Sequence, residues 1–311
     1  MAAPTNTYLT TAAIGNREDL SDTIFRISPT TTPVLSLASK SKATNTLHEW
    51  QVQDLATASA SNAQAEGDTI TPKVATPTAR ISNRTQISAK SVFVSGTQQA
   101  MNPAGRKDEL GYQLSLSSLE LKRDMEASIT QLDVIGTSPR QSRGLRGWVV
   151  DNIDTGAGYV APSVYTGTST VSTTDGTQAA FTEARLKNVL QKIFTAGGEP
   201  DTIILPPGAK QTFSTFTGNA TRFDKSEDAK LYASVDVYAS DFGEIRAVPD
   251  RFCRTRDVFV LQSDKVAIAY MRPFQTIELA QTGDAIGREL LVEWTVEMRA
   301  PKSAGAIYDI L

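Results

Sequence analysis

The residue types that most often carry catalysis or hold metals are scarce in this sequence of 311 residues, which has one histidine, His48, and one cysteine, Cys253. Zinc sites usually take three or four ligands from these two types, so the composition argues strongly against such a site. A single cysteine also leaves no partner for an internal disulfide. Any Ser-His-Asp or Cys-His mechanism would have to use His48 as its base.

Neither residue lies in a pattern that indicates catalysis. His48 precedes Trp50 by two positions in an alternating segment, and we interpret it as a packing or interface histidine. Cys253 lies between Arg251 and Arg254, whose positive charges would lower the pKa of its thiol. Because no base accompanies Cys253 in the sequence, we do not assign it as a nucleophile.

Short acidic motifs are equally weak candidates. Residues 154–156 form the Asp-Thr-Gly motif of aspartic proteases, but those enzymes need two such aspartates to share a proton, and this sequence has one. Glu66 and Asp68 offer carboxylates for a cation, as do Asp151 and Asp154, yet calcium loops need more oxygen ligands, so solvated loops are the better interpretation. The sequence contains no phosphate-binding glycine motif. We therefore predict a protein that is not an enzyme and needs no cofactor or metal.

The charge balance is nearly even, with 31 Lys and Arg against 34 Asp and Glu, whereas a dedicated nucleic-acid binder usually shows a basic excess. The most basic stretches, residues 140–146 and 251–256, are short and predict solvated surface.

The apolar runs are too short to span a membrane, and the first residues do not resemble a secretion signal. With 40% hydrophobic residues, we expect one large domain or two coupled ones with a substantial core.

The N-terminal part of the sequence predicts an arm followed by a hairpin. Residues 1–15 are polar and rich in Thr and Ala, which favours an extended arm. The runs 43–55 and 80–95 alternate as strands do, and the segment 56–79 between them has almost no large apolar residue. We predict a two-stranded arm with a polar tip. Because an isolated hairpin is marginal in water, a neighbouring subunit is its natural support.

The strongest helical signal covers residues 103–132. At 100° per residue one apolar stripe falls within an arc of about 60°; it contains Leu110, Leu114, Leu121, Met125 and Leu132. A second stripe on the opposite side contains Tyr112, Leu116 and Leu119. The helix therefore packs between two layers of its own domain, or part of the second stripe contacts another chain. A shorter helix is predicted from Asn16 to Ser28, and one further turn at residues 34–39.

The remainder of the sequence indicates an α/β region and then a long strand. Thr182 can cap a helix that ends at Gly197, and residues 208–216 are predicted to be helical. Strands are predicted at residues 202–205, 235–239, 244–248, 258–261 and 265–271. Residues 289–299 alternate cleanly, which predicts a strand with one buried face. The fold class is α+β.

A series of short segments runs in order along nearly the whole chain. They are Gly15–Asp22, Ile27–Pro33, His48–Gln51, Gln86–Ser88, Val94–Gln98, Gly105–Lys107, Glu120–Glu126, Thr195–Gly198, Gly218–Arg222, Val235–Tyr238, Asp241–Gly243, Arg272–Phe274 and Thr282–Asp284. Together these segments resemble a family of tailed-bacteriophage major capsid proteins with the Hong Kong 97-type fold. Each match alone is weak, but their shared order is specific.

The resemblance implies a division of the chain into five parts. They are an N-terminal arm (1–42), an extended loop or E-loop (43–95), the first part of a peripheral domain with the spine helix 103–132 (96–159), an axial domain (160–275), and the peripheral return strand with the C-terminus (276–311). Some relatives carry a fused N-terminal scaffolding domain. Because the first predicted helix begins near residue 16, we expect a separate scaffolding protein, or earlier removal of such a domain.

The resemblance also implies a function in assembly. The protein would form hexamers and pentamers and then an icosahedral head shell around double-stranded DNA. Expected partners are copies of itself, a scaffolding protein, a portal protein at one vertex, in some cases a decoration protein, and DNA bound without sequence specificity, with assembly in the bacterial host cytoplasm. Candidate intersubunit contacts are Trp50, Val52, Ile87, Val92 and Phe93 as anchors, and Glu66, Asp68, Arg80, Arg84 and Lys90 as ion-pair partners.

Two other classes of protein stay open at this stage. A cell-surface or fibre-like module would usually carry an export signal, and an enzyme with an unrecognised site would respond to metals or nucleotides. Covalent cross-linking through Lys73, as in some relatives, has no identifiable Asn partner in the sequence.

Overall fold

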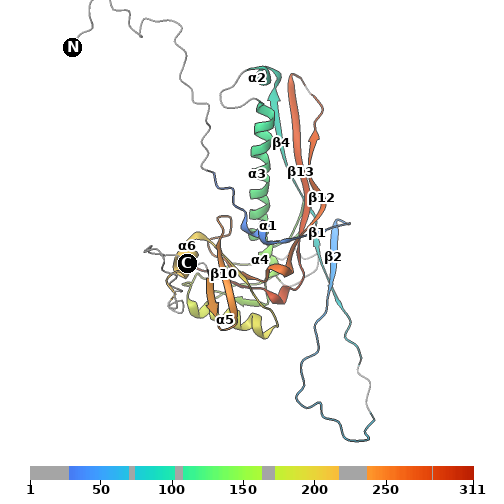
Figure 1. Ribbon diagram of the computed structural model, residues 1–311, viewed down its shortest axis with the longest axis vertical. Coiled ribbons are helices and arrows are strands. Elements are labelled where there is room, and N and C mark those ends of the chain that lie inside the picture. The colour runs from blue at the N-terminus through green and yellow to red at the C-terminus, as the bar shows by residue number, and fades with distance from the viewer. Residues whose placement is uncertain (1–27, 70–73, 102–107, 163–171, 217–236, 282) are drawn as a thin grey trace, which may run out of the picture.

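The computed structural model describes residues 28–69, 74–101, 108–162, 172–216, 237–281 and 283–311. The short helix expected at residues 16–28 lies almost wholly outside these ranges, and so does Lys73. Within them the chain forms a long helix laid along a four-stranded sheet, a second and more compact sheet with its own helices, and a hairpin that projects away from both (Figure 1). This arrangement is the α+β architecture expected from the sequence.

The four-stranded sheet has the order β1-β12-β13-β4 and supports the spine of the molecule. Its two longest strands, β12 and β13, form an antiparallel hairpin, and β4 pairs with β13 along the full length of β4. The strands are β1 (Ser39–Lys42), β4 (Gln86–Ser95), β12 (Val266–Glu278) and β13 (Ala285–Met298).

The helix α3 (Glu109–Gln131) runs along this sheet, as Figure 1 shows. It is shorter than the expected 103–132: Asp108 has extended backbone angles, and Leu132 ends the helix. Leu121, Met125 and Ile129 of α3 are buried in the core that contains Trp294 and Val296 of β13. The predicted apolar stripe is therefore the face that packs on the sheet.

Strand β13 begins at Ala285, four residues before the expected start, and the prediction of one buried face was wrong for its second half. Residues 290–298 are buried on both faces. Val292, Trp294 and Val296 face the core, whereas Glu293 and Glu297 on the other face are covered by polar side chains from distant segments. Alternation in a strand reports the chemical type of each face and not whether another element covers it.

The six-stranded sheet has the order β7-β14-β11-β8-β10-β9. Its central strands β8 (Thr202–Leu205) and β11 (Val258–Leu261) are buried at every position, as expected for short continuous apolar runs. The others are β7 (Asn152–Asp154), β9 (Val237–Ser240), β10 (Gly243–Pro249) and β14 (Gly305–Ile307).

Two helices belong to this second sheet. In α5 (Glu183–Thr195), the Oγ1 atom of Thr182 accepts a hydrogen bond from the N–H of Arg185 at 3.4 Å, so Thr182 is the predicted cap. The helix α6 (Pro207–Phe213) begins one residue earlier and ends three residues earlier than expected. Leu186, Val189 and Ile193 of α5 are buried in a core of their own beside β8 and β11.

The expected division of the chain at residues 160 and 275 does not follow the sheets. β7 and β14, which lie outside the range 160–275, pair with each other, and β14 pairs with β11 in the six-stranded sheet. Conversely, β12 begins at Val266 and pairs with β13 in the four-stranded sheet. The chain passes between the two sheets more often than a division into consecutive segments allows.

The predicted two-stranded arm is partly confirmed. β2 (Leu47–Val52) pairs antiparallel with β3 (Ala79–Arg84), and every described residue of the loop 53–78 between them is exposed. This loop extends far from the rest of the chain (Figure 1). Residues 86–95 do not continue the arm, because after Thr85 the chain enters β4 and pairs with β13.

Short elements complete the described chain. They are the helices α1 (Pro33–Leu37), α2 (Gly96–Ala100) and α4 (Leu145–Trp148), and the hairpin of β5 (Gly136–Thr137) and β6 (Arg140–Gln141). Two 3-10 helices of one turn each lie at Ser263–Lys265 and Pro301–Ser303. No described helix is both long and apolar enough to cross a membrane.

Candidate intersubunit surfaces

The projecting loop of residues 53–78 exposes apolar side chains that its own chain does not cover. Leu55 is 97% exposed and Val74 is 88% exposed. Sequence reasoning missed both as contact residues, although each is an isolated large apolar residue in a polar segment. Glu66 and Asp68 are also exposed near the middle of the loop, and neither forms an ion pair within the described chain. The loop therefore presents both apolar and charged groups to its surroundings.

The base of the loop is anchored in its own chain. The Nε1–H of Trp50 donates a hydrogen bond of 3.0 Å to the carbonyl of Met298, and its ring centroid lies 5.3 Å from that of Trp148. Val52 packs against the same core. The described contacts of Trp50 and Val52 are thus internal, and any contact with a neighbour stays a prediction.

Glu297 holds the hairpin to the sheet from the other side of β13. Its carboxylate accepts hydrogen bonds from Ser41 and Arg299 and lies 3.1 Å from Nε2 of His48. Burial would raise the pKa of Glu297, but hydrogen bonds from His48, Ser41 and Arg299 outweigh it and lower the pKa to about 2. His48 therefore helps to hold this hairpin on β13 through Glu297, and its ring packs beside that of Trp50.

The basic ion-pair candidates also find partners inside the chain. Arg80 lies 3.6 Å from Glu49 across the hairpin, with both side chains exposed. Lys90 pairs with Asp124 of α3 at 2.9 Å, and this hydrogen bond raises the pKa of Lys90. Arg84 is half-buried at the end of β3. Because exposed pairs exchange partners at little cost, these internal pairs leave intersubunit pairing as a prediction.

The face of β4 turned away from α3 carries exposed apolar side chains. Ile87 is 44% exposed and Phe93 is 59% exposed, and Ile277 of β12 is 39% exposed. Phe93 lies across Gly287 of β13, where an added Cβ would meet the ring at 2.5 Å. Val92 points to the opposite face and is half-buried. Ile87 and Phe93 therefore have the exposure that an intersubunit contact requires.

Residues 140–146 are largely buried, which corrects the expectation of solvated surface there, whereas in residues 251–256 only Cys253 is buried and the arginines stay at least partly exposed. Arg146 of α4 reaches Asp133, Asp175 and Asp257. Arg254 and Arg256 also contact Asp175, and Arg256 donates to the buried Asp309 at 2.7 Å. Burial raises the pKa of Asp257 to about 6, against the attraction of Arg254 and Arg146. This network joins the end of α3 to the six-stranded sheet.

The other sequence candidates for chemistry have structural roles. Cys253 is buried, and its thiol lies 3.3 Å from the carbonyl of Asp257. Burial raises the pKa of the Cys253 thiol, so the expectation of a lowered pKa was wrong. Asp154, from the Asp-Thr-Gly motif, accepts hydrogen bonds from Arg185 and Asn188 of α5. Among the described residues no group of three or more potential metal ligands occurs.

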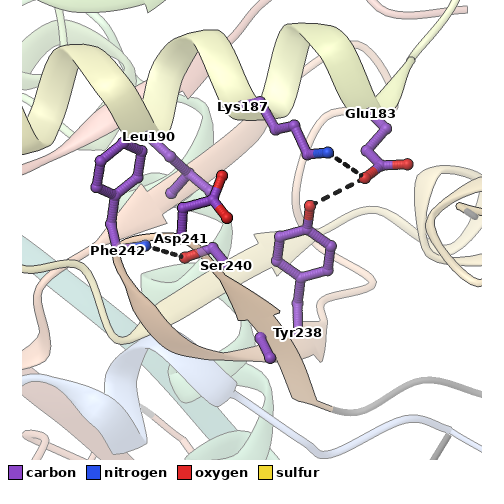
Figure 2. Close-up of a pocket in the computed structure, with 8 residues that line it drawn as sticks. Glu183, Lys187, Leu190, Tyr238, Ser240, Asp241 and Phe242 are labelled. Atoms are coloured by element: carbon purple, nitrogen blue, oxygen red, sulfur yellow. Dashed lines mark hydrogen bonds and ion pairs between the residues drawn. The ribbon is translucent and has the colours of Figure 1, made fainter. Parts of the chain in front are cut away.

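A small pocket lies between α5 and the β9–β10 hairpin, as Figure 2 shows. The hydroxyl of Tyr238 donates to Glu183 at 3.2 Å, and Lys187 pairs with the same carboxylate at 2.9 Å. Burial raises the pKa of Tyr238 to about 12. With a volume of about 100 Å³ the pocket is much smaller than typical ligand sites, and its polar groups satisfy one another.

A larger groove of about 610 Å³ runs between β4 and α3. Its walls are residues 91–95 on one side and, on the other, a mainly polar part of α3 that includes Leu116 of the second predicted stripe. The described chain thus offers surfaces for contact with other molecules and no catalytic arrangement.

Comparisons with known proteins agree with this geometry. The family model of the SU10 major capsid protein matches residues 3–311. The chain is 26% identical over 341 residues to the major capsid protein of Escherichia phage Phieco32, covering 94% of each chain. Its fold is similar to a chain of the capsid asymmetric unit of cyanophage A-1(L), with a TM-score of 0.71, 16% identity and coverage of 97% and 98%.

A chain from Gordonia phage Cozz has the same fold, with a TM-score of 0.62, 10% identity and coverage of 99% and 97%. The phage capsid neighbours confirm the fold expected from the sequence. Because the family model spans residues 3–311, the chain belongs to the SU10 major capsid protein family, and it is a structural capsid protein of the Hong Kong 97-type fold and not an enzyme.

Proposed function

We propose that this capsid protein forms hexamers and pentamers that close into an icosahedral head shell around double-stranded DNA. The observation that carries the proposal is the loop 53–78, which projects from a well-packed base and exposes Leu55 and Val74. A segment without a core of its own gains stability from contact with another surface. In a symmetric shell one such contact is repeated in every subunit.

In this proposal the parts of the chain have separate tasks. Within the arm 1–42 and the E-loop 43–95, the residues before α1 and the loop 53–78 reach adjacent subunits. The spine helix α3 and the four-stranded sheet form the peripheral domain, and the six-stranded sheet with α5 and α6 forms the axial domain nearest the capsomer centre. A separate scaffolding protein guides assembly in the bacterial host cytoplasm, a portal protein occupies one vertex, and a decoration protein is a further candidate partner. The net charge of −3 suits a wall that encloses DNA without binding it tightly.

Electron microscopy of the purified recombinant protein, with its mass measured in solution, tests the proposal. Shells, tubes or free hexamers and pentamers are the expected products. A stable monomer at every salt and protein concentration, even after addition of the candidate scaffolding protein, would contradict it. A thermal-shift scan across metals and nucleotides is the matched test of an enzyme, and we expect no stabilisation.

A further inference from the structure

The short helix α1 takes its cap from a distant part of the chain. Thr32, at the usual cap position, makes no side-chain hydrogen bond to the start of the helix. The N–H groups of Val34 and Leu35, which lack partners within the helix, donate instead to the two carboxyl oxygens of Glu126 at 2.7 and 2.8 Å. The side chain of Glu126 therefore caps α1 and joins it to α3 near the C-terminal end of that helix (Figure 1).

The structure of α1 depends on this contact. The helix has five residues, and isolated helices of that length do not persist in water. Apart from the bonds to Glu126, the burial of Val34 holds α1 in place. On the C-terminal side of α1 the chain is fixed, because β1 pairs with β12 from Ser39 onward. Loss of the contact with Glu126 would therefore release α1 and leave β1 in the sheet.

The surroundings of Glu126 disfavour a charge on its carboxyl group. Glu126 is fully buried, and so is Asp250 in the turn between β10 and β11. The Oδ2 atom of Asp250 has no hydrogen-bond partner among the described residues. The charge of Asp250 raises the pKa of Glu126, and burial raises the pKa of Asp250 itself. These two carboxyl groups share one region of low dielectric, where ionisation of either opposes ionisation of the other.

The other titratable or charged groups near Glu126 do not offset this effect. The helix α1 carries no charged side chain. In the turn after β10, Cys253 is buried and Arg251 is exposed. On α3 the guanidinium of Arg123 lies over the ring of Phe252, 5.6 Å from its centroid. The described chain thus places no cation where it would stabilise the ionised form of Glu126.

We propose that Glu126 is a pH-dependent switch, which holds α1 against the spine helix while its carboxyl group is protonated and releases α1 when that group ionises. In the released state water reaches Glu126, so its pKa returns to the ordinary value of 4.5, whereas burial raises the pKa in the docked state to about 7. The docked state binds the proton more tightly, so docking of α1 weakens as the pH rises through 7. The switch lies within one subunit and does not depend on the proposed assembly.

Hydrogen exchange of the full-length, unassembled protein at pH 5.5, 7 and 8.5 tests the switch. The protection factor of each amide, taken against exchange of the unfolded chain at the same pH, removes the intrinsic effect of pH. From pH 5.5 to pH 8.5 we expect the protection of the amides of Val34 and Leu35 to fall roughly 30-fold, the ratio that the two pKa values imply. Protection that stays constant over this range would overturn the proposal.

The amides of β11 distinguish release of α1 from unfolding of the whole subunit. They lie in a strand that is buried at every position. We expect the amides of Val34 and Leu35 to be less protected than those of β11 at every pH, because local release needs less free energy than global unfolding. Equal protection of the two sets at every pH would show that α1 leaves α3 only when the subunit unfolds, and would overturn the switch.

The variant Glu126→Gln removes the titrating group and keeps an oxygen that accepts hydrogen bonds. We expect the amides of Val34 and Leu35 in this variant to have the same protection at all three pH values. Glu120→Gln is the matched control, because it removes an exposed carboxyl group from the same helix and should keep the full decrease. A full decrease in Glu126→Gln would assign the effect to another group and overturn the proposal.

Asp250→Asn is a second variant, which serves if Glu126→Gln does not fold. Its side-chain oxygen can still accept the N–H of Phe252, as Asp250 does at 2.9 Å, but the like charge near Glu126 is removed. We expect the midpoint of the decrease in protection to move to lower pH, because ionisation of Glu126 is then less opposed. A midpoint that does not move would overturn the assignment of the switch to this pair of carboxyl groups.

Discussion

Glu126 lies in α3 with its side chain fully buried, and both oxygens of its carboxylate accept backbone N–H groups at the start of α1. Burial raises the pKa of Glu126 to about 7, because it outweighs the hydrogen bonds from Leu35 and Val34, and the charge of Asp250 adds to the increase. The side chain of Glu126 thus joins α1, the first described helix of the arm, to the spine helix, and its burial disfavours the charged form of its carboxylate.

The pKa of Glu126 predicts how stability depends on pH. Its value of about 7 in the folded protein exceeds the ordinary value of 4.5, so the folded state binds the proton first. The stabilising contribution of Glu126 is complete below that ordinary value and is lost as the pH rises through 7. The resulting change in the free energy of unfolding is on the order of 3 kcal/mol, from the linkage between proton binding and folding. Urea unfolding of unassembled protein between pH 5 and pH 8.5 measures it.

The variant Glu126→Gln is the control for this pH dependence. Asp257, whose pKa is also raised, to about 6, contributes with the same sign and stays in the variant. We therefore expect a flatter but still sloping profile for Glu126→Gln. A profile that keeps its full slope in the variant would show that Glu126 does not titrate in this range.

Trp50 allows a test of how the hairpin is anchored. Trp50→Phe removes the hydrogen bond to the carbonyl of Met298 and keeps an aromatic ring beside Trp148, so we expect a loss of about 1 kcal/mol in the free energy of unfolding. Trp50→Ala also removes the ring packing and should cost about 3 kcal/mol. Equal losses in the two variants would contradict ring packing as the main anchor. Denaturant unfolding of unassembled protein measures both.

At the scale of the element, substitutions in the loop 53–78 are expected to change assembly without changing the stability of the folded subunit. Leu55 and Val74 are almost fully exposed, so Leu55→Asp and Val74→Asp should leave the free energy of unfolding unchanged within about 0.5 kcal/mol. Each should weaken assembly, since burial of such a side chain is worth about 2 kcal/mol per contact. Sedimentation of assembled against free protein measures the effect.

Ser59→Asp is the matched control for the loop, because it adds the same charge at an exposed polar position. We expect it to assemble as the unmodified protein does. If Ser59→Asp impaired assembly as strongly as Leu55→Asp, the effect would be one of charge, and the apolar contact would be contradicted.

At the scale of the whole molecule, the ionic network around Arg146 joins the spine helix to the six-stranded sheet. Arg146→Met leaves the buried Asp257 without one of its two cationic partners and should cost about 3–5 kcal/mol. Lys302→Met removes an exposed pair with Asp54 and should cost less than about 1 kcal/mol. Thermal unfolding measures the loss of stability in both variants. Similar losses would show that burial of the network contributes little to the free energy of unfolding.

Local sequence pattern predicted the elements whose partners are close in the chain or whose burial is complete. The stripe containing Leu121 and Met125 predicted the spine helix, and the apolar runs 202–205 and 258–261 predicted strands that proved to be buried. The polar composition of residues 56–79 predicted a projecting loop. The scarcity of His and Cys argued against a zinc site and an internal disulfide. Each of these conclusions depends on residue type and spacing alone.

Tertiary structure decided which strand pairs with which, and which charges are buried. Residues 80–95 alternate continuously, yet the chain divides at Thr85, because Arg84 pairs with Leu47 whereas residues 86–95 pair with β13. The carboxylate of Glu126 accepts hydrogen bonds from residues that lie 92 and 91 positions away in the sequence. Arg146 pairs with Asp257, which is also distant in the sequence. A charged residue gives no local sign of burial, because the partner that offsets its desolvation arrives only when distant segments pack.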